Sequence, residues 1–421
     1  MSSRSARRQQ GRNIQDIKLE NRSLVFERIR SSGGISRAEL ARQTGLTPSS
    51  VTNIVKELSR LGLITESGLL ESSGGRRPAL LKINAQWGFI VGVYLARSWI
   101  SARLTDLNLG TAVSRRTEAS SLADPVEITV PALLSLIQEL ISDADVPRDK
   151  IIGIGICAPG PLDPHEGVFT TVPNFPGWND VPLRHIIEEE TGVMAILDND
   201  ATASALAEKW FGVAKEMSTF VYMLADTGVG GGIVIDGELY HGQHDIGGEI
   251  GHTTIDLHGP RCGCGNVGCL ELYASPQAIV AQVREVIRAG RESLIETWID
   301  KDLAKLTFET IVQAAQQGDD VALDAIHGMS EALAIGAINL MHSLDPEAIL
   351  IGGRAGLAGD LLFDTIDAVV RERCLSKESR EIPILPSQLG AEAPITGALC
   401  LVLREVFRDP QVWLTSHAAG R

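Results

Sequence analysis

One histidine and three cysteines have the residue types and spacing of a metal site. Cys262, Cys264 and Cys269 fall within eight residues, ten positions after His252. Together they offer one imidazole and three thiolates, a four-ligand set that structural Zn²⁺ takes, and no coordination position is left for water. We therefore predict one structural zinc ion per chain. The alternative is a group of reduced, buried cysteines.

Three polar residues stand between an apolar segment at positions 195–197 and a helical pattern at 201–211. They are Asp198, Asn199 and Asp200. Ligand sites in α/β proteins lie at the carboxyl ends of strands, so these side chains are candidates for ligand contacts. For Asp200 taken alone, the plain alternative is capping of the helix that follows.

A short amphipathic segment near the N-terminus has the pattern of a DNA-reading helix. Thr47 is a natural N-cap, Pro48 suits the first helical position, and apolar residues from Val51 to Leu58 fall on one face. The opposite face offers short donors and acceptors for base edges and one cation for phosphate. These residues are Ser49, Ser50, Thr52, Asn53 and Lys56.

The flanking residues complete a winged helix-turn-helix pattern. We expect a helix over residues 19–30 and a second helix opened by a capping box at Ser36 and Glu39. A β-hairpin, the wing, is expected after Gly62, with Arg76 and Arg77 in a turn that suits entry into a minor groove. The alternative is a three-helix protein-interaction module with a solvated basic loop.

Positive and negative charges are divided between the N-terminal segment and the rest of the chain. Residues 1–90 hold 15 Lys and Arg against 7 Asp and Glu, a net of +8, whereas residues 91–421 hold 23 against 46, a net of −23. Neutralising phosphates needs local positive potential, so polyanion binding is expected at the N-terminal end only.

Composition excludes several classes of protein. At 421 residues with 44% apolar and 22% charged residues, the chain is long enough for several globular domains. Its longest apolar stretch, Trp87–Ala96, is too short to cross a bilayer, and the polar, basic first residues lead into no apolar signal region. We expect a cytoplasmic protein without membrane partners.

The body after Trp87 reads as two similar α/β halves. Buried strands are expected at 88–95 and 151–156, and again at 219–224, with glycine-rich segments between them. A duplicated fold with a cleft between its lobes suits a ligand enclosed by hinge motion.

Three motifs carry a resemblance to a known family. Asp226–Gly232, the Gly-Glu-Ile-Gly-His run of 248–252, and the cysteine segment of 262–271 together resemble the ROK family of repressors and sugar kinases. The winged helix and its Gly-Arg-Arg-Pro loop resemble the regulator branch. The resemblance implies an α/β fold in which a winged helix-turn-helix precedes a two-lobed, actin-like sugar kinase body.

The resemblance also implies which residues hold a sugar. Asn199 and Asp200 match the family's sugar-binding pair, and Asp200 matches the general base of its kinases. The other matching positions are Gly160, Asn174, Glu249, His252 and Glu271. We expect a DNA-binding domain over residues 1–84, a small lobe over 85–199 completed by 387–421, and a large lobe over 200–386.

One departure from the family's kinases separates regulator from enzyme. Their first strand ends in an Asp-x-Gly-Gly-Thr-Lys phosphate loop, whereas this sequence has Tyr94-Leu95-Ala96-Arg97-Ser98-Trp99. Backbone N–H groups cradle phosphates only where side chains do not crowd the turn, so ATP binding there is not expected. The glycines of 228–232 remain, and we expect that a hairpin requires them at positive φ. The same explanation, a backbone need for glycine, is open for Gly352 and Gly353.

The sequence thus predicts a sugar-responsive transcriptional regulator, of the repressor type, that binds double-stranded operator DNA and a monosaccharide effector. We expect a homodimer or homotetramer, because helix-turn-helix readers use paired half-sites. The competing hypotheses are an ATP-dependent sugar kinase with an attached DNA-binding domain and a DNA-binding scaffold that senses a partner protein. The identity of the sugar and the sign of its effect on DNA binding stay open.

Overall fold

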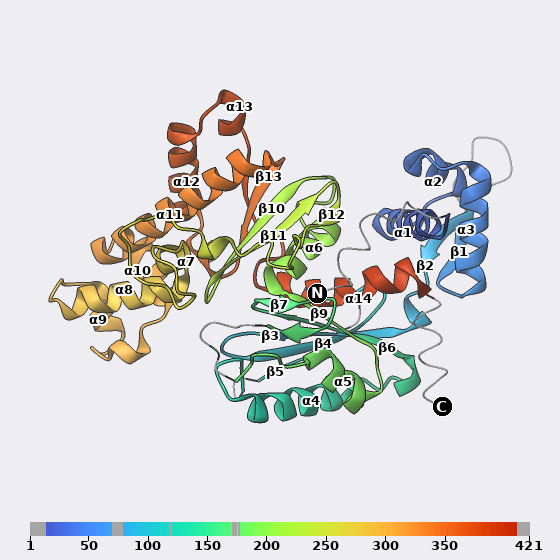
Figure 1. Cartoon of the computed structure of the whole chain (residues 1–421), viewed down its shortest axis with the longest axis horizontal. Helices are drawn as coiled ribbons and strands as arrows, with labels where there is room; N and C mark the ends of the chain where they lie inside the picture. The colour runs from blue at the N-terminus through green and yellow to red at the C-terminus, as the bar shows by residue number, and fades with distance from the viewer. Residues whose placement is uncertain are drawn as a thin grey trace.

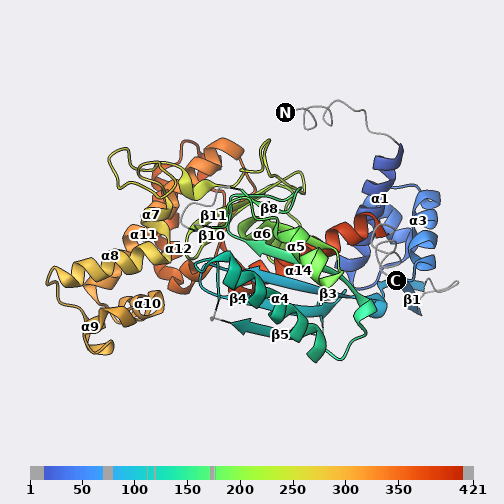
Figure 2. The same cartoon turned by 60° about the horizontal axis from the view of Figure 1, so that its bottom comes forward.

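The computed structural model describes residues 14–69, 79–110, 112–117, 120–170, 175 and 177–410. A small helical domain stands at one end, and two larger lobes make up the rest (Figure 1). Figure 2, turned by 60°, shows the same arrangement, with α1 and α3 at the end opposite α8–α10.

The N-terminal domain has three helices and a two-stranded wing. Its elements are α1 (Ile14–Ser32), α2 (Arg37–Thr44), α3 (Pro48–Arg60), β1 (Ile64–Leu69) and β2 (Ala79–Ile83). The wing strands pair antiparallel, and an isolated bridge joins Ile35 to Leu81. The predicted apolar face of α3 is buried, since Val51, Val55 and Leu58 have no exposed surface.

Local signals at the helix ends behave as expected with one exception. The Thr47 hydroxyl accepts from the Ser50 N–H at 3.2 Å, and Pro48 occupies the first turn of α3. Ser36 likewise accepts from the Glu39 N–H at 3.2 Å. The expected capping box is only half formed, because the Glu39 carboxylate turns to Arg42 and Gln43 instead of the Ser36 backbone.

Two five-stranded sheets have the same topology, which confirms the duplicated α/β body. The small-lobe order is β5-β4-β3-β6-β9 and the large-lobe order is β12-β11-β10-β13-β14. In each sheet an antiparallel three-strand meander is extended by two parallel strands.

The strand bounds are as follows. The first sheet contains β3 (Phe89–Leu95), β4 (Ile100–Asp106), β5 (Ala112–Thr117), β6 (Ile151–Ala158) and β9 (Ala195–Asn199), and the short β7 (Leu162–Asp163) and β8 (Val168–Phe169) pair beside it. The second contains β10 (Phe220–Ala225), β11 (Val229–Ile235), β12 (Glu238–Leu239), β13 (Ala348–Gly352) and β14 (Ile384–Pro386).

Helices cover both sheets. The small lobe has α4 (Val126–Asp143) and α5 (Leu183–Thr191). The large lobe has α7 (Glu271–Ala274), α8 (Pro276–Arg288), α9 (Leu294–Trp298), α10 (Phe308–Gln316), α11 (Asp320–Leu344), α12 (Asp360–Arg373) and α13 (Lys377–Arg380). Of the described helices, α11 is long and apolar enough to cross a membrane, but 67% of its apolar window is buried in the lobe, as in a core helix.

Two helices cross between the lobes. The helix α6 (Asp200–Phe211) follows the small-lobe sheet but packs on β10 and β11, while α14 (Ala393–Arg408) follows the large-lobe sheet and packs on β3 and β6. The two helices also pack on each other. In Figure 1 α14, in red, runs from this junction to the blue helix α1. The junction therefore connects both lobes to the N-terminal domain.

Aromatic and cationic side chains pack α1 against this junction. The Phe26 and Phe407 rings stack with centroids 3.5 Å apart. The Arg30 guanidinium lies 4.5 Å from the Trp210 ring centroid and donates to the Trp210 carbonyl at 3.2 Å. Trp210 lies near the end of α6, the same helix that begins at Asp200. One helix, α6, thus spans from the candidate sugar site to the N-terminal domain.

The prediction that the glycines of residues 228–232 are needed for positive φ is wrong. Residues 229–235 form strand β11, and Gly228, Gly230, Gly231 and Gly232 are absent from the described residues with positive φ. Close packing requires glycine instead, because a Cβ at Gly232 would lie 2.3 Å from the Ala201 carbonyl oxygen of α6. Of the second pair, Gly353 does adopt a positive φ, of 80°.

Candidate functional site

Asp200 is a buried carboxylate at the junction of the lobes. It is 7% exposed and begins α6. One carboxylate oxygen, Oδ1, accepts from the Ala201 N–H at 2.8 Å, and the Tyr94 hydroxyl from β3 lies 3.4 Å from Oδ2. The capping alternative for Asp200 does not hold, because Asn199 is the N-cap and accepts from the Ala201 and Thr202 N–H groups at 2.9 and 3.2 Å.

Three of the predicted sugar residues meet beside this helix start. A Cβ placed on Gly160 would lie 2.9 Å from Oε1 of Glu249 and 3.1 Å from Nδ2 of Asn199. The small lobe therefore presents Gly160 and Asn199 to a carboxylate of the large lobe. A side chain at position 160 would fill the space between them, which explains glycine at this position without a positive φ.

His252 and Glu271 join this polar group to the cysteine cluster. The Nε2 atom of His252 lies 4.0 Å from Oε2 of Glu249, and its Nδ1 atom lies 3.5 Å from Oε1 of Glu271. Nδ1 is also 3.6 Å from the Sγ atom of Cys262. One imidazole nitrogen, Nδ1, therefore lies beside both Cys262 and Glu271, while the other, Nε2, lies toward Glu249.

The four predicted metal ligands form one compact group. Ligand atoms of His252, Cys262, Cys264 and Cys269 all lie within 4.8 Å of one another. The Sγ atoms of Cys264 and Cys269 are 3.7 Å apart. A tetrahedral zinc with bonds of about 2.3 Å to sulfur separates two sulfurs by about 3.8 Å, so the donor set and its spacing fit the ion.

Tight turns bring the cysteines together. The Cys262 N–H donates to the Asn266 carbonyl at 2.8 Å, and Cys269 bridges to Thr254 across the loop. Gly268 has a φ of 65°, and a Cβ there would lie 1.7 Å from the Asp256 carbonyl oxygen. The loop can close over the ligands only with glycine at this position.

Burial perturbs the carboxylates of the site. Burial is the main cause that raises the pKa of Asp200 to about 6, while the positive charge of Arg97 opposes it. The pKa of Glu249 rises to about 7, first through burial and then through the charges of Asp200 and Glu271. Partly desolvated carboxylates so close together are typical of functional sites, where they accept hydrogen bonds from a bound ligand.

Sequence reasoning missed two side chains of this site. Arg97 was predicted only to obstruct a phosphate loop, yet a Cβ on Gly228 would lie 3.1 Å from both its Nη2 atom and Oε2 of Glu271. The hydroxyl of Tyr94, at the end of β3, lies 3.4 Å from Oδ2 of Asp200. The available signal was the expected difference between residues 94–99 and the phosphate loop of the family's kinases, which does not indicate where the side chains of Tyr94 and Arg97 point.

The glycine segments of the large lobe are linked by an ion pair. Arg354, which follows Gly353, has its Nε atom 2.5 Å from Oδ1 of Asp226, which precedes Gly228. Arg354 also lies 4.0 Å from Glu309. Charged side chains of this chain therefore meet where the two glycine segments approach each other.

The predicted recognition face is exposed on α3. Asn53, Lys56 and Ser49 are exposed, whereas Ser50 and Thr52 are half-buried. The hydroxyls of Ser49 and Ser50 hydrogen-bond to Thr47, and that of Thr52 donates to the Pro48 carbonyl at 2.7 Å. Asn53 and Lys56 are thus the members of this face best placed to contact DNA.

Three predicted residues lie outside the described part of the chain. They are Arg76 and Arg77 of the wing and Asn174 of the sugar set. The wing strands on either side of the arginines pair as expected.

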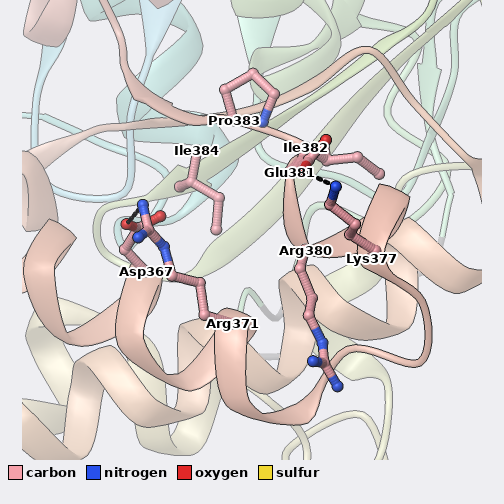
Figure 3. Close-up of a pocket in the computed structure, with 8 residues that line it drawn as sticks. All are labelled: Asp367, Arg371, Lys377, Arg380, Glu381, Ile382, Pro383 and Ile384. Carbon is pink, nitrogen blue, oxygen red and sulfur yellow. Dashed lines mark ion pairs between the residues drawn. The ribbon is translucent and has the colours of Figure 1, made fainter.

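A surface pocket lies away from this polar site, between α12, α13 and β14 (Figure 3). It encloses about 520 Å³ and is open to solvent. Two of its cations are already paired, Arg371 with Asp367 at 2.7 Å and Lys377 with Glu381 at 3.7 Å. The pocket has none of the acidic site's buried carboxylates, so we do not assign it a ligand.

Comparison with known sequences agrees with this division of the chain. The ROK family matches residues 91–405, and a family described as winged helix-turn-helix DNA-binding matches residues 21–65. The xylose repressor of Caldicellulosiruptor bescii is 32% identical over 395 residues, which cover 94% of this chain and 98% of that protein.

Solved structures share the fold. A ROK family transcriptional regulator, described as a homologue of the E. coli Mlc protein, has a TM-score of 0.80 at 30% identity and covers 95% of this chain and 99% of its own. A ROK family glucokinase from Streptomyces griseus, in complex with glucose and AMPPNP, has a TM-score of 0.68 at 29% identity, over 75% of this chain and 99% of its own. The chain therefore belongs to the ROK family and carries a winged helix-turn-helix DNA-binding module.

Proposed function

We propose that this protein is a sugar-responsive transcriptional regulator, of the repressor type, for genes of carbohydrate metabolism. One observation carries the proposal. The helix that begins at the polar site, with Asp200, carries Trp210 near its other end, and Trp210 holds Arg30 of the DNA-binding domain. A ligand that closes the lobes around Asp200 can therefore shift the DNA-reading helices.

The effector is a monosaccharide held by acceptors and donors from both lobes. We assign sugar contacts to Gly160, Asn174, Asn199, Asp200, Glu249, His252 and Glu271. Closely spaced carboxylates and an amide suit vicinal hydroxyls, because ionised acceptors make the stronger hydrogen bonds. Relatives named as repressors for xylose and N-acetylglucosamine are consistent with this class of effector.

Zinc is the ion that suits the Cys₃His group. Bound there, it would stabilise the loop of residues 252–269 and would fix His252 through Nδ1, which leaves Nε2 toward Glu249 and the sugar. All four positions are filled by protein ligands, so the assigned role is structural.

We further propose a cytoplasmic homodimer or homotetramer that places two winged helices on paired half-sites of operator DNA. Such spacing is how helix-turn-helix dimers read the major groove. Base contacts are assigned to α3, through Ser49, Ser50, Thr52, Asn53 and Lys56, and wing contacts to Arg76 and Arg77. The domain limits remain 1–84, 85–199 with 387–421, and 200–386.

The test begins with the purified full-length protein and random-sequence duplex DNA, from which repeated selection should isolate one palindromic operator. Thermal unfolding against a panel of monosaccharides should then show one class of sugar that stabilises the protein. A ligand at about 100 times its dissociation constant adds about 2.7 kcal/mol. If no DNA sequence is selected while a sugar still raises the thermal midpoint, the proposal that the protein is a transcriptional regulator is contradicted.

The competing candidate is an ATP-dependent sugar kinase with a DNA-binding domain. A general base acts only when the transferred phosphoryl group and Mg²⁺ are positioned beside it. Here Tyr94 contacts Asp200, and Arg97 crowds the segment in which kinases bind phosphate. We expect no phosphate transfer from labelled ATP to sugar. A turnover of about 1 per second would favour the kinase hypothesis.

A DNA-binding scaffold that senses a partner protein is the third hypothesis. It predicts that no monosaccharide alters the thermal midpoint or operator binding, whereas the sugar-responsive regulator predicts both effects. The same panel therefore separates the two.

A further inference from the structure

Arg97 reaches from one lobe to the other. It lies in the turn between β3 and β4, where the Ala96 N–H donates to the Trp99 carbonyl at 2.9 Å. Its Nη2 atom approaches Gly228 of the large lobe, since a Cβ on that glycine would lie 3.1 Å away. Oε2 of Glu271 lies at the same distance from that point. The guanidinium thus stands beside a predicted sugar residue.

The donors of this guanidinium are available to a ligand. Across the described ranges, no hydrogen bond or ion pair to protein holds Arg97, and its guanidinium carbon lies 5.2 Å from the Phe175 ring centroid. Stacking on an aromatic ring orients the flat group, while its five N–H donors remain in the plane. The side chain is half-buried, so part of it remains accessible to solvent and to a ligand.

The surrounding charge selects the kind of ligand. Asp200, Glu249 and Glu271 place three carboxyl groups around one guanidinium, and the Arg97 charge opposes protonation of Asp200. A second cation nearby, Arg354, is already paired with Asp226. The acidic groups thus outnumber the available positive charge, so an anionic ligand such as a phosphate ester would meet net repulsion.

We propose that Arg97 is an effector-binding and specificity-determining residue, which donates hydrogen bonds to hydroxyl oxygens of a neutral monosaccharide from the segment that in family kinases binds phosphate. This inference rests on the proposed sugar-responsive function and adds to it the small-lobe donor and the charge class of the effector. It also explains how the lobes can close on a sugar without a nucleotide between them.

The test compares Arg97→Ala, Arg97→Lys and the exposed control Arg371→Ala of the surface pocket (Figure 3). Calorimetric titrations use full-length protein with xylose, glucose, N-acetylglucosamine and glucose 6-phosphate. For the neutral sugar that binds the wild type, Arg97→Ala should weaken affinity by about 10- to 100-fold, the range expected when a charge-assisted hydrogen bond is lost. Arg97→Lys should recover part of the loss, and Arg371→Ala should bind normally.

A pH series separates binding from support of the fold. Asp200 is faced by Tyr94, Cys157, Arg97, Asp226 and Glu249. Without the Arg97 charge, Asp200 should protonate at higher pH, so the loss of sugar affinity on acidification should begin at higher pH in Arg97→Ala than in Arg97→Lys. Operator affinity without sugar should match the wild type in both variants.

Two results would overturn the proposal for Arg97 alone: wild-type sugar affinity in Arg97→Ala, or tighter binding of glucose 6-phosphate than of every neutral sugar. If no monosaccharide of the thermal-unfolding panel binds the wild type, which nonetheless binds its operator, the sugar-responsive function itself fails, and the Arg97 assignment fails with it.

Discussion

Replacing Asp200 with asparagine should stabilise the ligand-free protein while impairing its response to sugar. Asp200 is 7% exposed, and burial raises its pKa from the ordinary 3.8 to about 6. The ionised carboxylate is therefore held at a cost to folding. Asparagine has nearly the same shape and can still accept from the Ala201 N–H, but it carries no charge.

The size of the effect follows from the pKa change. A rise from 3.8 to about 6, at about 1.4 kcal/mol per pH unit, makes ionisation about 3 kcal/mol less favourable in the folded protein. Between these two pH values the folded state binds more protons than the unfolded state, so wild-type stability falls as pH rises. Asp200→Asn should gain nothing near pH 4 and up to about 3 kcal/mol above pH 6.

The measurement is chemical denaturation of both proteins from pH 4 to pH 8, with exposed Asp364→Asn as the control that should follow the wild type. Sugar affinity of Asp200→Asn should drop at pH 8, because a neutral acceptor binds hydroxyls more weakly than a carboxylate. Equal stability of variant and wild type across the whole range would refute the reasoning about the buried charge.

Three further outcomes are expected. Cys264→Ser should lose the one zinc ion found per chain by elemental analysis and should bind sugar more weakly, since His252 links the two sites; a zinc-free protein with full sugar affinity would contradict this link. In operator titrations, Asn53→Ala should cost about 1 to 3 kcal/mol at particular base pairs, whereas Lys56→Ala should weaken all sequences alike and reduce the salt slope by about 1; identical losses would contradict these roles. Arg30→Ala removes the contact with Trp210 and should leave sugar binding intact while reducing its effect on operator affinity, which fluorescence anisotropy can measure; an unchanged effect would exclude this contact from the coupling.

Patterns with strict spacing could be predicted from the sequence. The period of the apolar residues located α3, and the separation of three cysteines from one another and from His252 located the Cys₃His group. The glycine, Asn-Asp and Gly-Glu-Ile-Gly-His motifs located most of the polar site. Each of these signals lies within a short stretch of sequence, or is a motif of the family whose fold this chain shares.

Contacts between distant segments could not be predicted. Nothing in the residues around Arg97 indicates that its guanidinium reaches Gly228, more than a hundred positions later, and Asn199 rather than Asp200 proved to be the helix cap. The need for Gly232 arises from the approach of α6, not from its own φ. Such features depend on how the lobes pack, which a one-dimensional pattern does not contain.

Coupling between sugar and operator is the central claim, and one thermodynamic cycle tests it most directly. Labelled operator is titrated with full-length protein with and without saturating sugar, and the sugar is titrated into protein with and without operator. The account predicts that sugar changes operator affinity by about 5- to 150-fold and that operator changes sugar affinity by the same factor. If the sugar binds tightly but leaves operator affinity unchanged, α6 does not link the two sites and the account is wrong.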